Sequence, residues 1–158
     1  MKRRVNVRGI AINEQGSLLA VKHRGQDGSE SEFWATPGGG VDEGESLLDG
    51  LTREFVEELG IVPEIGRVLF MQQYTRTRLS GEKIDCLEVL FHIKNHREFE
   101  KEIDLSKTSH GHELARVAFI DPKVEDLLPD FLQKIDIPDQ INNDRPVHII
   151  DNLHEPSR

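Results

Sequence analysis

The sequence predicts an α/β fold, in which a mixed sheet lies between helices as an α/β/α sandwich. Short apolar runs of alternating polarity recur along the chain, and such runs are typical of strands. Residues 47–59 instead repeat apolar positions with a helical period, and a second helix signal begins near residue 121. With 158 residues, of which 36% are hydrophobic, the chain can bury one core but is short for two ordinary domains. We therefore expect a single domain over residues 1–158.

The first part of the chain is predicted to alternate strands and turns before it enters a helix. The expected elements are a strand at 5–12, a tight turn at 13–16, its hairpin partner at 18–22, a loop at 24–32 and a short strand at 33–36. The run Pro37-Gly38-Gly39-Gly40 is not expected to continue a regular element, and it lets the backbone approach a ligand closely. Ser46 is the expected N-cap of the helix at 47–59, and Gly60 is placed to end it.

The second part of the chain is predicted to contain another hairpin, one more strand and one more helix. The expected ranges are strands at 68–78 and 85–94 around a turn at 80–82, a strand at 114–120, and a helix from Asp121 through about Gln133. Pro129 inside that helix is expected to split or shorten it. Residues 95–112 are charged and irregular, and neither they nor the tail from Asp136 has a predicted role. No internal repeat or linker marks a second domain.

The helix at 47–59 carries an acidic strip beside its apolar stripe. At about 100° of rotation per residue, Glu54, Glu57 and Glu58 fall within an arc of roughly 100°. Three carboxylates on one strip repel one another unless positive charge lies against them. Arg53 supplies one such charge, and hard divalent cations with oxygen ligands are the natural remainder. The strip therefore indicates a metal site. A solvated acidic face would explain the helix, but not the spacing of the residues before it.

The segment from Gly39 to Ile61 resembles the Nudix box of MutT-like hydrolases. The matching positions, in order, are Gly39, Glu45, Arg53-Glu54-Phe55, Glu57-Glu58 and Gly60-Ile61, separated by five, seven, one and one residues. Every specified position is filled, although Phe55 is bulkier than the aliphatic residue usual there. The resemblance implies the Nudix-type α/β/α sandwich. It also implies an enzyme that hydrolyses a nucleoside diphosphate linked to another moiety X.

The resemblance also implies roles for residues of the box. Glu57, Glu58 and Glu54 are expected to bind Mg²⁺, with Mn²⁺ as a substitute and with the backbone carbonyl of Gly39 as a further ligand. Magnesium would neutralise the charge of the pyrophosphate and orient an in-line attack by water. Arg53 is expected to orient a glutamate through an ion pair rather than to touch substrate. The backbone carbonyl of Gly40 is the alternative to that of Gly39 as the further ligand. The resemblance implies that Glu45 is paired within the box, and a purely structural acid is the alternative for it.

The general base is left open between two residues. Glu54 is a metal ligand, a base, or both, whereas Glu113 precedes the strand at 114–120, where many Nudix proteins carry a further acid. The alternative for Glu113 is a solvated glutamate at the end of a loop. The nearby His110 and His112 are candidates for contact with a phosphate, but ordinary loop histidines are the default interpretation.

Arginines are the expected substrate contacts, because a guanidinium suits bidentate capture of phosphate. Arg24, Arg8 and Arg76 lie on or beside predicted strands that can line a cleft, with Arg78 as a further candidate; each is otherwise a surface charge. The aromatic candidates for base stacking are Trp34, Phe33 and Tyr74, and core packing is their alternative. The positions that resemble ADP-ribose and dinucleoside polyphosphate signatures are not filled, which leaves the nucleoside triphosphate group by elimination.

The net charge of −9 argues against a non-specific nucleic-acid or membrane surface, each of which needs a basic face. We therefore expect a small nucleotide-like substrate, no nucleic-acid or membrane partner, and a homodimer as an open alternative. The N-terminal residues lead into an alternating strand rather than an apolar signal segment, so a cytoplasmic location is expected. Two other functions remain: a catalytically quiet nucleotide-sensing module, and an isomerase of related fold, which would need a well-placed cysteine in addition to acids. The single cysteine, Cys86, lies near no recognised motif.

Overall fold

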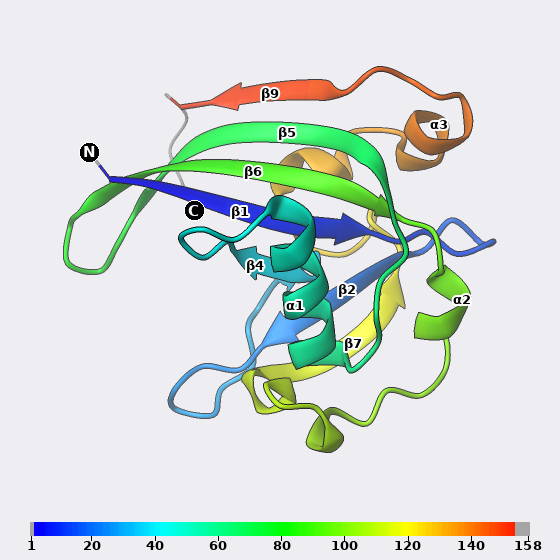
Figure 1. Cartoon of the computed structure of the whole chain (residues 1–158), viewed down its shortest axis with the longest axis horizontal. Coiled ribbons are helices and arrows are strands. Elements are labelled where there is room, and N and C mark those ends of the chain that lie inside the picture. Colours follow the sequence, from blue (N-terminus) through cyan, green and yellow to red (C-terminus); the bar gives the residue numbers. More distant parts are fainter. Residues whose placement is uncertain (1, 154–158) are drawn as a thin grey trace.

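The strands form two mixed sheets rather than one (Figure 1). The computed structural model describes residues 2–153; Met1 and residues 154–158 of the predicted domain lie outside the described residues. The first sheet has the order β4 (Gly38–Gly40), β1 (Lys2–Ile10), β6 (Lys83–Ile93), β5 (Ile65–Thr77) and β9 (His148–Asn152). The second has the order β7 (Leu114–Ile120), β2 (Leu18–His23), β3 (Trp34–Ala35) and β8 (Leu127–Leu128). Both contain parallel and antiparallel pairs, so the predicted α/β class with mixed pairing is confirmed, and its strands are divided between two sheets.

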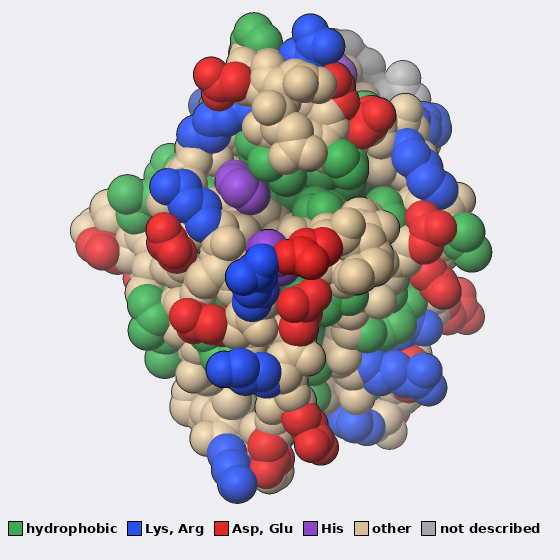
Figure 2. All heavy atoms as spheres, turned by 90° about the vertical axis from the view of Figure 1, so that its right-hand side faces the viewer, with side chains coloured by type: hydrophobic (Ala, Val, Ile, Leu, Met, Phe, Trp, Pro, Cys, Tyr) green, Lys and Arg blue, Asp and Glu red, His purple; other side chains and the backbone are tan. Residues whose placement is uncertain are grey.

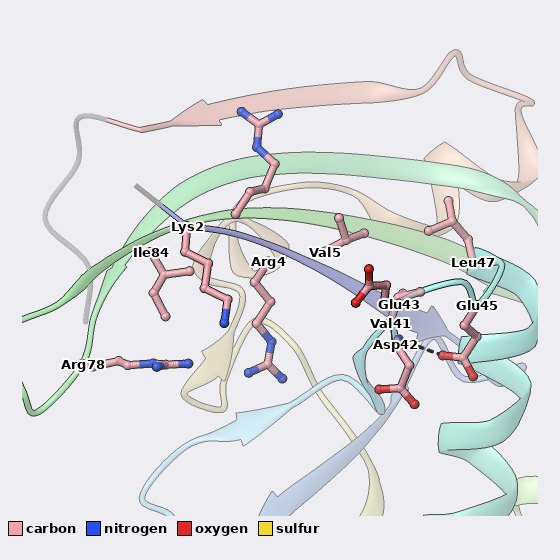
Figure 3. Close-up of a pocket in the computed structure, with 11 residues that line it drawn as sticks. Lys2, Arg4, Val5, Val41, Asp42, Glu43, Glu45, Leu47, Arg78 and Ile84 are labelled. Carbon is pink, nitrogen blue, oxygen red and sulfur yellow. Dashed lines mark hydrogen bonds between the residues drawn. The ribbon is translucent and has the colours of Figure 1, made fainter.

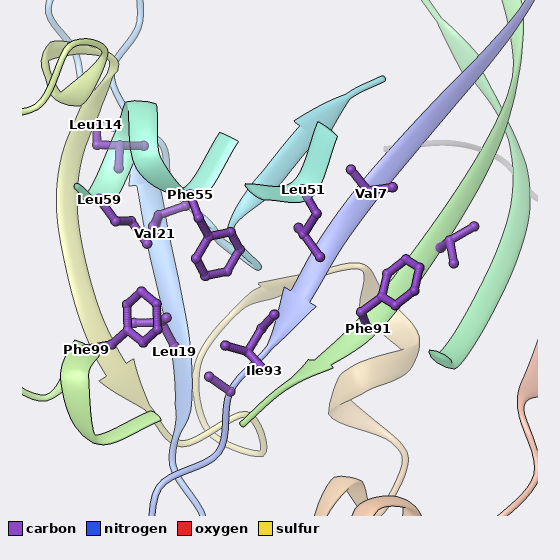
Figure 4. Close-up of a cluster of buried hydrophobic side chains, with 12 residues drawn as sticks. Val7, Leu19, Val21, Leu51, Phe55, Leu59, Phe91, Ile93, Phe99 and Leu114 are labelled. Carbon is purple, nitrogen blue, oxygen red and sulfur yellow. The ribbon is translucent and has the colours of Figure 1, made fainter. Parts of the chain in front are cut away.

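Both sheets are covered on two sides, because neighbouring residues of the central strands pack into different hydrophobic clusters. In β2, Leu19 and Val21 join the cluster around helix α1 (Leu47–Leu59), whereas Leu18 and Ala20 join the cluster on the opposite side. The α1 cluster, shown in Figure 4, consists of Val7, Ala11, Leu19, Val21, Leu51, Phe55, Leu59, Val89, Phe91, Ile93, Phe99 and Leu114. The opposite cluster receives side chains from the short helix η3 (Asp130–Gln133) and from α3 (Ile137–Asn142). The helix–sheet–helix layering follows from this alternation.

Helix α1 begins and ends where the sequence predicts. The Ser46 hydroxyl accepts a hydrogen bond from the Asp49 amide at 3.1 Å, and the Gly60 amide donates to the carbonyls of Phe55 and Val56. The bulky Phe55 is fully buried against β1, where a Cβ atom on Gly9 would stand only 2.5 Å from the Phe55 ring. A glycine in the adjacent strand therefore makes room for the aromatic residue that is unusual in the box.

The predicted hairpin of 5–12 with 18–22 is wrong. Only an isolated bridge joins Ile12 to Leu18, and the chain then passes from one sheet to the other. Strand β1 pairs with β4 and β6, whereas β2 pairs with β3 and β7. Both strands are buried on two faces along much of their length. A strand that is apolar on both faces suits the centre of a sheet better than a hairpin with one solvent-exposed face.

The predicted helix from Asp121 through Gln133 is also wrong. Its first turn forms, since the amides of Val124 and Glu125 both donate to the Asp121 carbonyl at 3.1 Å. The chain then extends, because Leu127 is fully buried and β8 pairs in parallel with β3. This tertiary pairing overrides the local helix signal, and Pro129 begins the separate 3-10 helix η3.

The described part of the tail after Asp136 packs against the rest of the chain. It forms α3, whose Ile137 is buried, and then β9, which pairs in parallel with β5 at one edge of the first sheet (Figure 1). The Gln140 side-chain amide donates to the carbonyls of Leu69 and Pro146, at 3.1 and 2.7 Å, and so joins the tail to β5. The three remaining short helices are α2 (His96–Phe99), η1 (Leu105–Lys107) and η2 (Gly111–Glu113). Among residues 2–153, the helices are too short and polar to cross a membrane.

Candidate active site

The glycine run lies directly against the acidic strip of α1. Gly38–Gly40 form strand β4, antiparallel to β1 with Gly39 opposite Val7, so our expectation of an irregular turn is wrong. A Cβ atom on Gly39 would stand 2.6 Å from the carboxylate carbon of Glu54, closer than a real Cβ contact. Glycine therefore allows the backbone of β4 to lie on a metal-ligand candidate, which a larger residue would displace.

Arg53 contacts several acidic residues of the box at once. Its guanidinium donates to both oxygens of Glu45, at 2.8 and 2.9 Å, and to Glu54 at 2.9 Å. It also contacts Glu57 at 3.4 Å and donates to the Gly40 carbonyl at 3.0 Å. Hydrogen bonds from Arg53 lower the pKa of Glu45 to about 2, and the same contacts, with Glu45 first, raise the pKa of Arg53. The planar guanidinium of Arg53 thus fixes the relative positions of the loop that carries Glu45, strand β4 and helix α1.

Glu58 differs from its neighbours because it is almost fully buried. Its exposed fraction is 5%, and its Oε2 atom has no hydrogen-bond partner among the described residues. Burial raises the pKa of Glu58 to about 8, and the charges of Glu54, Glu113 and Glu57 add to this effect, whereas Arg8 opposes it. A buried carboxylate that lacks a partner is costly, so this atom marks a place where a cation would be strongly favoured.

The carboxylates of Glu54, Glu57 and Glu58 are the kind of ligand that a hard divalent cation prefers. In this structure, however, their oxygen atoms do not point to one common position. Among residues 2–153, no three His, Cys, Asp or Glu side chains already stand in a metal-binding arrangement. Arg53 draws two of the acids, Glu54 and Glu57, toward itself and screens their repulsion. The unpartnered oxygen of Glu58 and the adjacent carboxylates supply the oxygen ligands that magnesium prefers.

The loop that carries η1 and η2 is attached to the C-terminal end of α1. The His110 amide donates to the Glu57 carbonyl at 2.7 Å, and its Nδ1 atom lies 3.0 Å from Oε2 of Glu57. The Thr108 hydroxyl donates to the Glu58 carbonyl at 3.1 Å. These contacts bring the exposed Glu113 close enough for its charge to act on Glu58. The contact of His110 with Glu57 was not predicted, because nothing local in the loop points to α1.

Arg8 lies in a buried polar network behind the acidic strip. Its guanidinium pairs with Glu88 at 3.1 Å and donates to the Thr36 carbonyl at 2.9 Å, while the Tyr74 hydroxyl donates to Glu88 at 3.2 Å. Burial disfavours the charge of Arg8, but Glu88 and Tyr74 more than offset this and raise its pKa. Sequence reasoning missed Glu88, although an acid at the centre of an apolar strand was a signal that could have found it.

Comparison with known proteins decides the family. The family model described as the NUDIX domain matches residues 2–136. The chain belongs to the NUDIX domain family. A curated relative, an RNA pyrophosphohydrolase from Psychrobacter sp. (strain PRwf-1), is 45% identical over 60 residues, which cover 38% of this chain and 32% of the relative. Thus the match spans about a third of that relative's length.

Solved structures share the NUDIX fold with this chain. The solution structure of the E. coli ORF135 protein is 24% identical, with a TM-score of 0.58 over 84% of this chain and 85% of that one. The crystal structure of a MutT protein from Methanosarcina mazei Go1 is 20% identical, with a TM-score of 0.59 over 92% of this chain and 97% of that one. At these identities the likeness supports the fold, and function is argued from the site.

The other substrate candidates of this NUDIX chain lie in different surroundings. Arg24 is exposed, donates from its side chain to the Gly28 carbonyl at 3.2 Å, and donates its amide to the Glu113 carbonyl at 2.8 Å. Arg76 is exposed near the end of β5, opposite Ile84. Trp34 is buried in the opposite core cluster, with the Lys22 ammonium 5.3 Å from its ring centroid. The roles of Arg24, Arg8 and Arg76 in substrate binding therefore stay predictions.

The raised pKa of Glu58 predicts that the metal-free protein loses stability as pH rises. Between pH 6 and 8 the unfolded chain has this group ionised, while the folded protein still binds its proton, so the free energy of unfolding falls. The expected loss is about 2 kcal/mol, from 1.36 kcal/mol per pKa unit. Urea unfolding in EDTA at the two pH values measures it. Glu58→Gln should remove most of the difference, and an unchanged difference in that variant would contradict the assignment.

Proposed function

We propose that this protein is a divalent-metal-dependent pyrophosphohydrolase that cleaves a phosphoanhydride bond in a nucleoside diphosphate linked to another group X. The observation that carries the proposal is the buried, unpartnered carboxylate of Glu58 beside Glu54 and Glu57. A bound cation would compensate these charges, whereas a protein that had lost its site has no physical need for three adjacent repelling acids. The family membership of the chain and the activity named for its curated relatives support the same reaction class.

Each residue of the site has a role in this proposal. Glu54, Glu57 and Glu58 would hold Mg²⁺, or Mn²⁺ in its place, with the backbone of Gly39 close by. When bound, the ion would supply positive charge against the pyrophosphate and would favour deprotonation of the attacking water. Arg53 holds the carboxylates of Glu54 and Glu57 in place through its hydrogen bonds.

We infer that the substrate carries a nucleoside 5′-polyphosphate, either as a nucleoside triphosphate or at the 5′ end of an RNA. The triphosphate group remains by elimination of other signatures, and the RNA end is suggested by relatives described as RNA pyrophosphohydrolases. Both present the same anhydride bonds. The net charge opposes a broad nucleic-acid surface, and basic and acidic side chains are interspersed on the face in Figure 2. One strand end needs only a local group of cations, so the proposal revises our expectation of no nucleic-acid partner.

Release of phosphate or pyrophosphate from a substrate panel tests this function. The panel holds nucleoside triphosphates, damaged nucleoside triphosphates, ADP-ribose, dinucleoside polyphosphates, nucleotide sugars and a 5′-triphosphorylated oligonucleotide, each with Mg²⁺ and with EDTA. Metal-dependent turnover of the nucleoside 5′-polyphosphate members is the expected result. Binding without turnover across the panel would contradict it and favour a nucleotide-sensing module.

The general base is tested separately with Glu113→Gln. If Glu113 is the base, kcat should fall by about 10²- to 10⁴-fold with little change in KM, and the slope of the pH–rate profile on its acidic side should flatten. Measurement of kcat and KM across pH at saturating Mg²⁺ gives both quantities. Unchanged activity would place the base on Glu54.

A further inference from the structure

A buried ion pair joins β1 to β6 inside the first sheet. The Nε atom of Arg8 lies 3.1 Å from one oxygen of Glu88, whose side chain is only 3% exposed, and the Tyr74 hydroxyl donates to the other oxygen at 3.2 Å. The strand register places the three side chains on one face of the sheet, along a diagonal across β1, β6 and β5. A buried pair adds little net stability, because both charges lose their hydration. Its presence here therefore needs another explanation.

The guanidinium of Arg8 is held at two of its nitrogen atoms and open at the third. Its Nε pairs with Glu88, and its Nη1 donates to the Thr36 carbonyl at 2.9 Å. Within residues 2–153, its Nη2 atom finds no hydrogen-bond acceptor, and the side chain is 20% exposed. An arginine that is fixed in this way, with donors to spare, is preorganised to bind an anion.

Arg8 lies where the chain crosses from one sheet to the other, beside the acidic strip. Thr36, whose carbonyl it holds, stands between β3 of the second sheet and the glycine run of β4, and Gly38 is opposite Arg8 in the β1–β4 pairing. The charge of Arg8 acts on Glu58 and on His23, so both lie near it. A polyphosphate held by a cation at Glu58 would therefore come close to this guanidinium.

Other cations of the same strand are turned elsewhere. A separate pocket of about 680 Å³ opens on the side of β4 away from Glu54 (Figure 3). Lys2 and Arg4, from the start of β1, point into this pocket together with Arg78. Among the basic residues of β1, Arg8 is therefore the one that is placed for the acidic strip.

We propose that Arg8 binds a phosphate oxygen of the substrate and that Glu88 is the residue that positions it. The inference rests on the proposed function, since it takes the polyphosphate to lie at the acidic strip. Glu88 acts only through Arg8: its carboxylate fixes the Nε side of the guanidinium, Tyr74 fixes the carboxylate, and Nη2 is left for the substrate. Because Glu88 already balances the charge of Arg8, the arginine leaves Glu58 to the cation.

A double-mutant cycle tests the positioning role. KM and kcat for a nucleoside triphosphate are measured at saturating Mg²⁺ in Arg8→Met, in Glu88→Gln and in the double variant. We expect each single change to raise KM by about tenfold and to leave kcat within about twofold, because the lost contact is made equally in the ground and transition states. The double variant should resemble Arg8→Met, since Glu88 then has nothing left to position. Additive losses in the double variant would overturn the inference.

Mn²⁺ affinity, measured without nucleotide, distinguishes this role from a structural one. A pair that merely held the Thr36 carbonyl and the glycine run in place would weaken metal binding when it is broken. We expect folded Glu88→Gln to bind Mn²⁺ like the wild type, and a loss of affinity as large as the rise in KM would contradict the inference. Asp85→Asn is the matched control: it breaks the pair of Arg3 with Asp85, 2.7 Å apart on the same two strands, and should leave KM unchanged.

Tyr74→Phe replaces Glu88→Gln if the latter does not fold, as judged by thermal unfolding. This variant keeps both charges and removes only the hydroxyl that holds Glu88. It should raise KM about threefold, as expected for the loss of one neutral hydrogen bond, and an unchanged KM would count against the positioning role.

Failure of the proposed function can be told apart from failure of this inference. If the wild type turned over no member of the substrate panel, the hydrolase would be overturned. Calorimetry with a non-hydrolysable nucleoside triphosphate and Mg²⁺ would then decide the role of the pair. Binding that is about tenfold weaker in Glu88→Gln than in the wild type would support the inference, and equal affinities would refute it.

Discussion

Glu57→Gln is expected to lower kcat by about 10²- to 10⁴-fold while the fold stays intact, because the loss of one metal ligand removes several kcal/mol of transition-state stabilisation. The amide keeps the size of the side chain, and Glu57 lies on the partly exposed strip of α1 rather than in the core. Steady-state kinetics over a range of Mg²⁺ concentrations measures the loss. Circular dichroism and thermal unfolding check the fold.

Glu102→Gln is the matched control for this loss, since it removes the same charge from an exposed loop position. Its kcat should stay within about twofold of the wild type, as expected for a surface substitution. A Glu57→Gln protein that remained active at ordinary Mg²⁺ concentration would overturn the assignment of Glu57 as a ligand.

Arg53→Lys is expected to lower kcat by about 10²-fold, although the charge is conserved. An ammonium group cannot reproduce the fork that joins Glu45, Glu54 and the Gly40 carbonyl. Without that fork the acids repel each other and the loop loses its attachment to α1, so a higher Mg²⁺ requirement should accompany the fall in kcat. Kinetics at several Mg²⁺ concentrations separates the two effects.

The control for Arg53→Lys is Arg97→Lys, because Arg97 forms an exposed ion pair with Glu14 and neither residue belongs to the box. Exposed pairs contribute little, so this variant should be nearly unchanged in activity and stability. Equal activity of Arg53→Lys and Arg97→Lys would show that charge alone, and not the fork, matters at residue 53.

The sequence was sufficient for the elements whose signals are local. The bounds of α1 follow from Ser46, the apolar period and Gly60, and the β5–β6 hairpin follows from two alternating runs around one turn. It was not sufficient for pairings between distant segments. The division into two sheets, the short β8 and the addition of β9 depend on tertiary contacts that a periodic pattern does not encode.

The same distinction applies to the candidate site. Glu54, Glu57, Glu58 and Arg53 share one helix, so their grouping could be read from spacing alone. Glu88 and His110 reach the site from a strand and a loop that are distant from α1 in sequence. The burial that distinguishes Glu58 from its neighbours likewise depends on the packing of whole layers.

Mn²⁺ binding at pH 8 tests most directly the assignment of Glu58 as a metal ligand. It is measured as the loss of the electron paramagnetic resonance signal of the free ion. The wild-type chain and Glu102→Gln should bind the ion alike, whereas Glu58→Gln should bind it at least about tenfold more weakly, because a buried ligand without its charge no longer attracts a cation. Equal Mn²⁺ affinity in the wild type and in Glu58→Gln would contradict the account.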